Sequence, residues 1–193
     1  MRYLQVIAAI TLSTVFAAQA ADVPRQSPNL VINLSPNKQI RLSDYRGKTV
    51  VLAFILTYCS HCQAVVRGLI KDQEELGPKG LQVVAAAIED MAATAVPGFI
   101  RQFAPPFPVG YSTNKEAINY LQHSPMMGFY MPALVFIDKD GMIRFQCEGR
   151  DPLLNLATQE KGVRDKILEV MGPASSAPAP APVSAKKNRG KKS

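Results

Sequence analysis

Continuous apolar runs alternate along the middle of the chain with segments whose apolar residues recur at helical spacing. The run over residues 50–56 is apolar throughout and partly β-branched, which predicts a strand buried on both faces. Residues 81–88 and 133–137 have the same character, and residues 107–111 predict a shorter strand. Helical spacing predicts helices over 64–76, 96–103 and 114–121, and a last helical region over 151–171 that Gly162 could interrupt.

Two turn signals predict hairpins. Residues 30–34 and 39–42 are short apolar pieces separated by a polar turn that contains Pro36 and Asn37. The second turn, Asp138-Lys139-Asp140-Gly141, leads into a strand over 142–147. Strands that alternate with helices, followed by a hairpin and a terminal helix, predict an α/β sandwich with a mixed sheet.

The charge of the chain is concentrated at its ends. The 193 residues contain 22 basic and 15 acidic side chains, and Arg2 and five basic residues after residue 185 account for most of the excess. Residues 21–172 therefore have a net charge of only +1. This distribution excludes a basic domain built to bind nucleic acid, so we expect no specific nucleic-acid partner.

The first 20 residues have the pattern of a signal peptide. Arg2 is followed by a mostly apolar, uncharged stretch over residues 4–18, and Ala18-Gln19-Ala20 supplies small residues at a cleavage site. We therefore expect a periplasmic or secreted bacterial protein, in a compartment where disulfides persist. The alternative is that the segment is kept as a membrane-anchoring helix.

Residues 173–193 predict a disordered tail rich in alanine, proline and basic residues. The favoured interpretation is a solvated tail, and weak contact with an anionic surface is the alternative. One folded domain is then expected over residues 21–172, and we expect it to be a monomer.

Cys59 and Cys62 carry the strongest chemical signal in the chain. They lie where a predicted buried strand gives way to a helix, and a helix N-terminus favours a thiolate through its unpaired N–H groups and its dipole. The spacing of three residues brings the second sulfur within disulfide reach across the first turn. We expect Cys59 to attack a substrate disulfide and Cys62 to resolve the mixed disulfide.

Two neighbours of this pair are candidate supporting residues. His61, between the cysteines, can donate to the Cys59 thiolate or place positive charge beside it, which would make the oxidised pair a better oxidant. The alternative is an exposed residue at the start of the helix. Met131-Pro132 precedes a predicted buried strand, where proline removes no ladder hydrogen bond.

These features together resemble a TlpA-like member of the thioredoxin superfamily, in the AhpC/TSA branch that is related to the peroxiredoxins. The match runs in order through residues 28–171. The resemblance implies a thioredoxin-like three-layer sandwich, with a central mixed sheet and an N-terminal β-hairpin extension. It rests on Leu42-Ser43-Asp44-Tyr45-Arg46-Gly47-Lys48, on the strand into Cys59-Ser60-His61-Cys62, on Met131-Pro132-Ala133 and on residues 136–141.

The resemblance also implies a function. It predicts an extracytoplasmic thiol–disulfide oxidoreductase, with Cys59 as nucleophile, Cys62 as resolving thiol and Pro132 in cis beside them. The expected partners are protein thiols or disulfides and a membrane or periplasmic redox protein, and no cofactor or metal is expected. The Ser60-His61 pair is similar to the dipeptide of oxidising and isomerising relatives, although the direction of electron flow stays open.

Four positions depart from the family pattern. Tyr58 stands where the family usually has tryptophan, and it can shield the sulfur of Cys59. Ala53 and Val65 stand where many relatives have an acidic residue, so proton transfer needs another group or water. Met131 replaces the commoner small or β-branched residue before the proline.

Two other functions compete with this interpretation. A peroxiredoxin-like peroxidase needs Thr or Ser three residues before its reactive cysteine, where this chain has Leu56, and Thr57 is one position away. A Sco-like copper chaperone would use both cysteines and His123, because soft thiolates suit Cu(I). Copper chaperones of this type have their cysteines four residues apart.

Two further features have more than one interpretation. Cys147 is expected to be a half-buried core thiol, with a regulatory or intermolecular disulfide as the alternative. A group of apolar side chains could line a docking groove near the cysteines or pack in the core: Met126, Met127, Phe129, Tyr130 and Met131.

Overall fold

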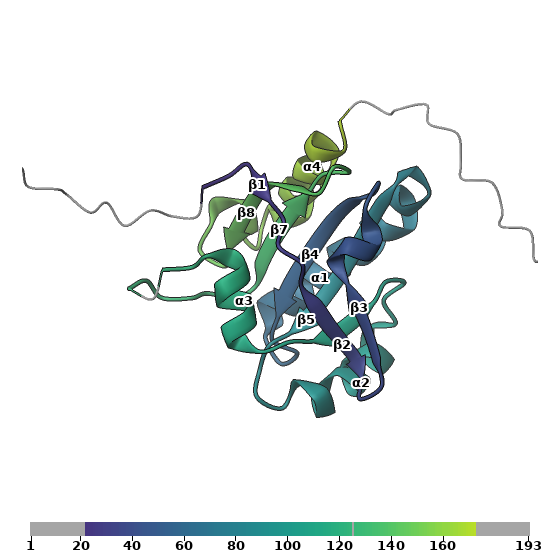
Figure 1. The fold of residues 1–193 in the computed structure, drawn as a ribbon, viewed down its shortest axis with the longest axis vertical. Coiled ribbons are helices and arrows are strands. Elements are labelled where there is room, and N and C mark those ends of the chain that lie inside the picture. Colours follow the sequence, from purple (N-terminus) through teal and green to yellow (C-terminus); the bar gives the residue numbers. More distant parts are fainter. Residues whose placement is uncertain (1–21, 125, 173–193) are drawn as a thin grey trace, which may run out of the picture.

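The computed structural model describes residues 22–124 and 126–172, and these residues form one twisted sheet covered by helices on both faces (Figure 1). In the described part of the chain the sheet has eight strands in the order β1-β8-β7-β4-β5-β6-β2-β3. The strands are β1 (Arg25–Gln26), β2 (Val31–Ser35), β3 (Lys38–Arg41), β4 (Thr49–Ile55), β5 (Leu81–Ala87), β6 (Val109–Tyr111), β7 (Ala133–Ile137) and β8 (Met142–Glu148). The helices are α1 (Ser60–Leu76), α2 (Ala92–Phe103), α3 (Asn114–Leu121) and α4 (Gln159–Met171), with short 3-10 turns at Leu42–Tyr45, Gly77–Lys79 and Pro152–Leu154.

The centre of the sheet is formed by the apolar runs. β4 pairs in parallel with β5 and antiparallel with β7, and every residue of β4 and β7 is buried. Their alternate side chains supply two cores, one beneath α1, α2 and α4 and the other beneath α3 and β2. The three-layer α/β sandwich with a mixed sheet is thus confirmed.

The N-terminal hairpin is confirmed as an extension at one edge of this sheet. β2 and β3 pair antiparallel, and β2 joins the sheet through Asn33, which lies opposite Tyr111 of β6. Ile32 is fully buried and belongs to the core on the α3 side. The hairpin therefore extends the sheet at the side away from β7 and β8.

The structure differs from the predicted boundaries at three helices. α1 begins at Ser60, directly after Cys59, so that Cys62 lies in its first turn. α2 begins at Ala92, four residues earlier than predicted, because the small Ala92 is buried together with Val96 and Phe99. α4 runs through Gly162 without a break, and its preceding 3-10 turn is a separate element.

A buried ion pair joins two helices on the same face of the sheet. Asp72 of α1 is only 3% exposed, and its carboxylate accepts a hydrogen bond of 2.8 Å from Nη1 of Arg164 in α4. Burial raises the pKa of Asp72, while Arg164 acts in the opposite direction. α1 is thus held to α4 through a pair that is costly to break.

The predicted signal peptide over residues 1–20 and the predicted tail over 173–193 lie outside the described residues. Within the part of the chain that is described, no helix combines the length and the apolar character needed to cross a membrane.

Candidate active site

Cys59 is the N-cap residue of α1. β4 ends at Ile55, a short turn follows, and Cys59 has extended backbone angles of φ −77° and ψ 118° immediately before the helix. Its Sγ accepts a hydrogen bond from the backbone N–H of Cys62 at 3.3 Å. The sulfur thus takes the place of the oxygen that usually caps a helix, where N–H donors and the helix dipole stabilise negative charge.

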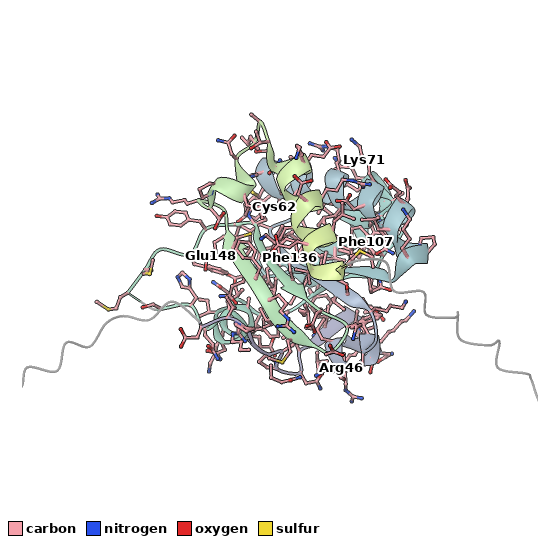
Figure 2. The ribbon with its side chains drawn as sticks, turned by 90° about the horizontal axis from the view of Figure 1, so that it is seen from above. Arg46, Cys62, Lys71, Phe107, Phe136 and Glu148 are labelled. Atoms are coloured by element: carbon pink, nitrogen blue, oxygen red, sulfur yellow. The ribbon has the colours of Figure 1, made fainter. Side chains whose placement is uncertain are left out.

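The two sulfurs differ in exposure. Cys59 is half-buried, whereas Cys62 is completely buried in the core beneath α1. Figure 2 shows Cys62 among the interior side chains, and Lys71 of the same helix at the outside of the molecule. Burial raises the pKa of the Cys62 thiol well above its ordinary value. The pair therefore combines a partly accessible sulfur, that of Cys59, with a protected sulfur, that of Cys62.

Sheet register places Met131 and Pro132 at the same end of the sheet as the cysteines. Phe54 of β4 lies opposite Ala133 of β7, so the residues just before β7 lie across from the end of β4. The peptide bond between Met131 and Pro132 is cis. Met131 is partly buried and packs against both cores, one of which also contacts Cys59.

The structure places Tyr58 at the surface and His61 against the segment around the start of α4. Tyr58 is 72% exposed, so most of its ring is open to solvent. Nε2 of His61 lies 2.8 Å from the carbonyl oxygen of Leu154 and 2.9 Å from Oε1 of Gln159. Because both oxygens accept, the Nε2–H of His61 points to the segment before α4 and does not donate to Cys59.

Sequence reasoning missed a carboxylate next to this turn. Oε1 of Glu89, which follows β5, accepts hydrogen bonds from the backbone N–H of Thr57 at 3.1 Å and from the Thr57 hydroxyl. The Thr57 carbonyl accepts from Nε2 of Gln63, in the first turns of α1, at 2.9 Å. The sequence contained a signal for this contact, because Thr57 follows β4 and Glu89 follows β5. The carboxyl ends of these two parallel strands meet at one edge of the sheet.

His123 does not lie ready to bind a metal. Its Nδ1 is 2.7 Å from Oε1 of Glu148, and its Nε2 is 3.1 Å from the carbonyl oxygen of Met127. Among residues 22–124 and 126–172, no three His, Cys, Asp or Glu side chains lie close enough together to hold a metal ion. The geometry therefore lends no support to the copper alternative.

The apolar side chains before Pro132 are divided between two environments. Met127 and Tyr130 line a groove of about 530 Å³ beside β8, and Met126 is strongly exposed. Phe129 and Met131 pack against the core instead. Cys147 also lines this groove but is 5% exposed, and burial, followed by the charge of Asp151, raises the pKa of its thiol.

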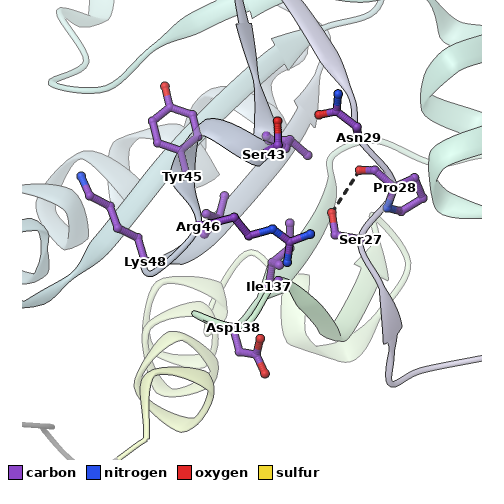
Figure 3. Close-up of a pocket in the computed structure, with 12 residues that line it drawn as sticks. Ser27, Pro28, Asn29, Ser43, Tyr45, Arg46, Lys48, Ile137 and Asp138 are labelled. Atoms are coloured by element: carbon purple, nitrogen blue, oxygen red, sulfur yellow. Dashed lines mark hydrogen bonds between the residues drawn. The ribbon is translucent and has the colours of Figure 1, made fainter.

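A second, smaller pocket lies at the opposite end of the sheet. Figure 3 shows it between the turn that precedes β4 and the end of β7, where Arg46 and Asp138 are found. Its volume is about 40 Å³, and neither cysteine of the pair lines it. A space of this size holds about one water molecule, so it offers no room for a protein substrate.

Comparison with known proteins decides the family. The model of the AhpC/TSA family matches residues 23–146, well over half of the chain. The chain belongs to the AhpC/TSA family. The resemblance inferred from the motifs around Cys59 and Pro132 is thereby confirmed.

The chain is similar to several proteins named thiol-disulfide oxidoreductase ResA. The protein from Bacillus thuringiensis subsp. konkukian (strain 97-27) is 27% identical over 128 residues, which are 66% of this chain and 70% of that protein. The protein from Bacillus subtilis (strain 168) is 26% identical over 117 residues, 61% of this chain and 62% of that protein.

Solved structures share the fold. A thiol:disulfide interchange protein of the thioredoxin family from Chlorobium tepidum TLS matches with a TM-score of 0.60 at 18% identity, over 77% of this chain and 99% of that chain. A thiol:disulfide interchange protein from Bacteroides sp. matches with a TM-score of 0.57 at 18% identity, over 73% and 91% of the two chains. The thioredoxin-like fold is therefore confirmed.

Proposed function

We propose that the protein is an extracytoplasmic thiol–disulfide oxidoreductase that exchanges electrons with protein thiols and disulfides through Cys59 and Cys62. The observation that carries the proposal is the capping geometry, in which the half-buried Cys59 sulfur accepts the N–H of the fully buried Cys62. The names of the ResA relatives support the same class of activity.

The asymmetry of the pair supports one order of events. The Cys59 thiolate attacks a disulfide R–S–S–R′, forms a bond to the R sulfur and releases R′–S⁻, which takes up a proton. Cys62 then loses its proton and attacks the Cys59 sulfur, which breaks the mixed disulfide and releases R–S⁻. Two electrons pass to the substrate while the Cys59–Cys62 disulfide forms, and the reverse sequence oxidises a substrate dithiol.

Met131 and Pro132 fit a role in holding the substrate. They lie at the end of the sheet that carries the cysteine pair, immediately before β7. We infer that an extended segment of the substrate runs past the Met131 backbone and so brings its sulfur to Cys59. His61 supports the pair from the other side, where its hydrogen bond to Leu154 holds the start of α1 in place.

Location and partners belong to the same proposal. The apolar stretch over residues 4–18 and the small residues at Ala18 and Ala20 support export. An exported thiol–disulfide oxidoreductase would exchange electrons with a redox partner at the membrane or in the periplasm. Fractionation of cells that express the full chain, with N-terminal sequencing of the mature protein, tests cleavage after Ala20.

Insulin reduction in the presence of a thiol reductant tests the assigned roles. We expect Cys59→Ser to abolish catalysis, and Cys62→Ser to accumulate a mixed disulfide that is stable enough to isolate. Cys147→Ser is the matched control, because Cys147 lies on β8 outside the pair, and it should retain activity. Full activity of Cys59→Ser would contradict the proposal.

Equilibration with glutathione decides the direction of electron flow. A potential of about −270 mV would indicate a thioredoxin-like reductant, and one of about −120 mV a strong oxidant. We expect an intermediate value, because the N-terminus of α1 stabilises the Cys59 thiolate and so favours the reduced pair.

A further inference from the structure

The two carboxylate oxygens of Glu89 differ in their hydrogen bonding. Oε1 accepts both donors of Thr57, whereas Oε2 is buried and has no hydrogen-bond partner among the described residues. A buried carboxylate oxygen without a partner is costly, and in native proteins it calls for a specific explanation. Both hydrogen bonds go to uncharged groups, so none of the residues that the structure describes pairs a positive charge with this carboxylate.

Backbone hydrogen bonds on both sides of Glu89 fix its position beside the turn that precedes Cys59. The N–H of Ile88 donates to the carbonyl of Ile55 at 3.1 Å, which continues the β4–β5 ladder, and the Glu89 carbonyl accepts from Ala92 at 3.0 Å. Ala85 and Ala87 face the core that contains Cys62, and Glu89, two residues beyond the end of β5, reaches Thr57 in the turn before α1.

Thr57 connects Glu89 to the reactive sulfur. Its N–H and hydroxyl are held by Glu89, and its carbonyl is held by Gln63 of α1, so all three polar groups of Thr57 are fixed. Cys59 follows two residues later, and its own N–H donates to the carbonyl of Leu56 at 3.1 Å. Because this bond closes the turn, the Cys59 sulfur lies on the order of 10 Å from the carboxylate.

We propose that Glu89 is a positioning residue of the cysteine pair. Through its hydrogen bonds to Thr57, Glu89 fixes the turn that presents Cys59. Its negative charge, which no positive charge compensates among the described residues, favours the disulfide over the dithiol. The proposal rests on the proposed function, since it concerns the same redox pair. A negative charge at this position opposes the Cys59 thiolate that the N-terminus of α1 stabilises. The positions that hold an acidic residue in many relatives carry Ala53 and Val65 here, and Glu89 supplies a carboxylate from the segment that follows β5.

Three variants separate the charge from the hydrogen bonds. Glu89→Gln keeps an oxygen that can accept both bonds from Thr57 but removes the charge. Thr57→Val keeps the charge and the backbone N–H but removes the hydroxyl. Asp90→Asn is the matched control, because it removes an exposed charge from the next residue of the chain.

The measurement is the equilibrium of the full chain with reduced and oxidised glutathione, followed by alkylation of free thiols. Glu89→Gln should shift the equilibrium toward the dithiol by about tenfold, the size expected for a unit charge some 10 Å away at a protein-like dielectric constant. Thr57→Val should leave the equilibrium within about twofold of the original chain and slow insulin reduction. Asp90→Asn should change neither quantity by more than about twofold, because its charge is solvated.

An unchanged equilibrium for Glu89→Gln, or an equal shift for Asp90→Asn, would overturn the inference while leaving the proposed function intact. Failure of the original chain to form the Cys59–Cys62 disulfide with glutathione would overturn the proposed function itself, and the role of Glu89 with it.

Discussion

Replacing Gly149 by alanine tests how closely the backbone is packed around the candidate substrate site. Gly149 follows β8, and its N–H donates to the carbonyl of Tyr130 at 3.0 Å. A Cβ at this position would lie 2.4 Å from the carbonyl oxygen and 2.9 Å from the carbonyl carbon of Met131. Both atoms belong to the backbone just before Pro132, so no side-chain rotation relieves the contact.

The magnitude follows from these distances. An ordinary contact requires about 1 Å more separation, which only a shift of the Met131 segment or of the turn at Gly149 provides. Overpacking of this kind costs about 1–3 kcal/mol, and distortion of the hydrogen bond to Tyr130 adds about 1 kcal/mol. We therefore expect Gly149→Ala to lower the free energy of unfolding by about 3 kcal/mol.

The same shift should affect reaction with proteins more than reaction with small molecules. A displacement of about 1 Å in a group that orients the substrate costs about tenfold or more in rate. Insulin reduction by Gly149→Ala should therefore slow by that factor. The rate at which Cys59 reacts with a small disulfide reagent should stay the same, because Cys59 caps α1 and does not belong to the displaced segment.

Gly68→Ala is the control for the change from glycine to alanine. Gly68 lies inside α1, and a Cβ there would be no closer than 3.7 Å to Cγ of Glu160, an ordinary contact. It should stabilise the protein by about 0.5–1 kcal/mol. Urea unfolding that gives Gly149→Ala the midpoint of the original chain, together with an unchanged insulin rate, would refute the close approach to Met131.

Two further predictions concern α3 and Cys147. Hydrogen bonds from the backbone N–H of Thr113 and the hydroxyl of Ser112 lower the pKa of Glu116, so its stabilisation is present above its ordinary pKa of about 4.3 and is lost as pH falls through the lowered value. Glu116→Gln should therefore cost about 1 kcal/mol at pH 7 and much less at pH 3 in urea unfolding, and an equal loss at both pH values would count against the cap. Because burial raises the pKa of Cys147, iodoacetamide should label Cys59 in the folded protein and Cys147 only after unfolding, as mass spectrometry would show. Labelling of Cys147 at the rate of a free thiol would contradict its burial.

Much of the fold was predictable because local signals and burial agree. The limits of α3 and of β7 are those that the sequence predicts. Thr113 and Glu116 form a capping box at the start of α3, and Pro132 ends the loop before β7. The start of α2 was predicted wrongly because Ala92, Thr94 and Ala95 are small or polar and give little hydrophobic period, although Ala92 is buried.

The site was predictable where it is local in sequence and not where it depends on tertiary contacts. The spacing of Cys59 and Cys62 at the end of an apolar strand already implies that the Cys59 sulfur lies at the helix N-terminus and that the Cys62 sulfur lies deeper. The partners of His61 are 93 and 98 residues away along the chain, and Glu89 is 32 residues from Thr57. No local pattern encodes such distances, so these contacts emerge only when the sheet and α4 are assembled.

The attachment of α1 to α4 has a consequence for local unfolding. His61 fixes the first turn of α1 to the segment that precedes α4, and Asp72 fixes the fourth turn of α1 to Arg164 of α4 itself. The reactive helix therefore cannot fray alone from its N-terminus, as a helix end in solvent would. Its amide protons should exchange with solvent in one cooperative step with those of α4. This coupling keeps the Cys62 sulfur inaccessible to solvent between turnovers.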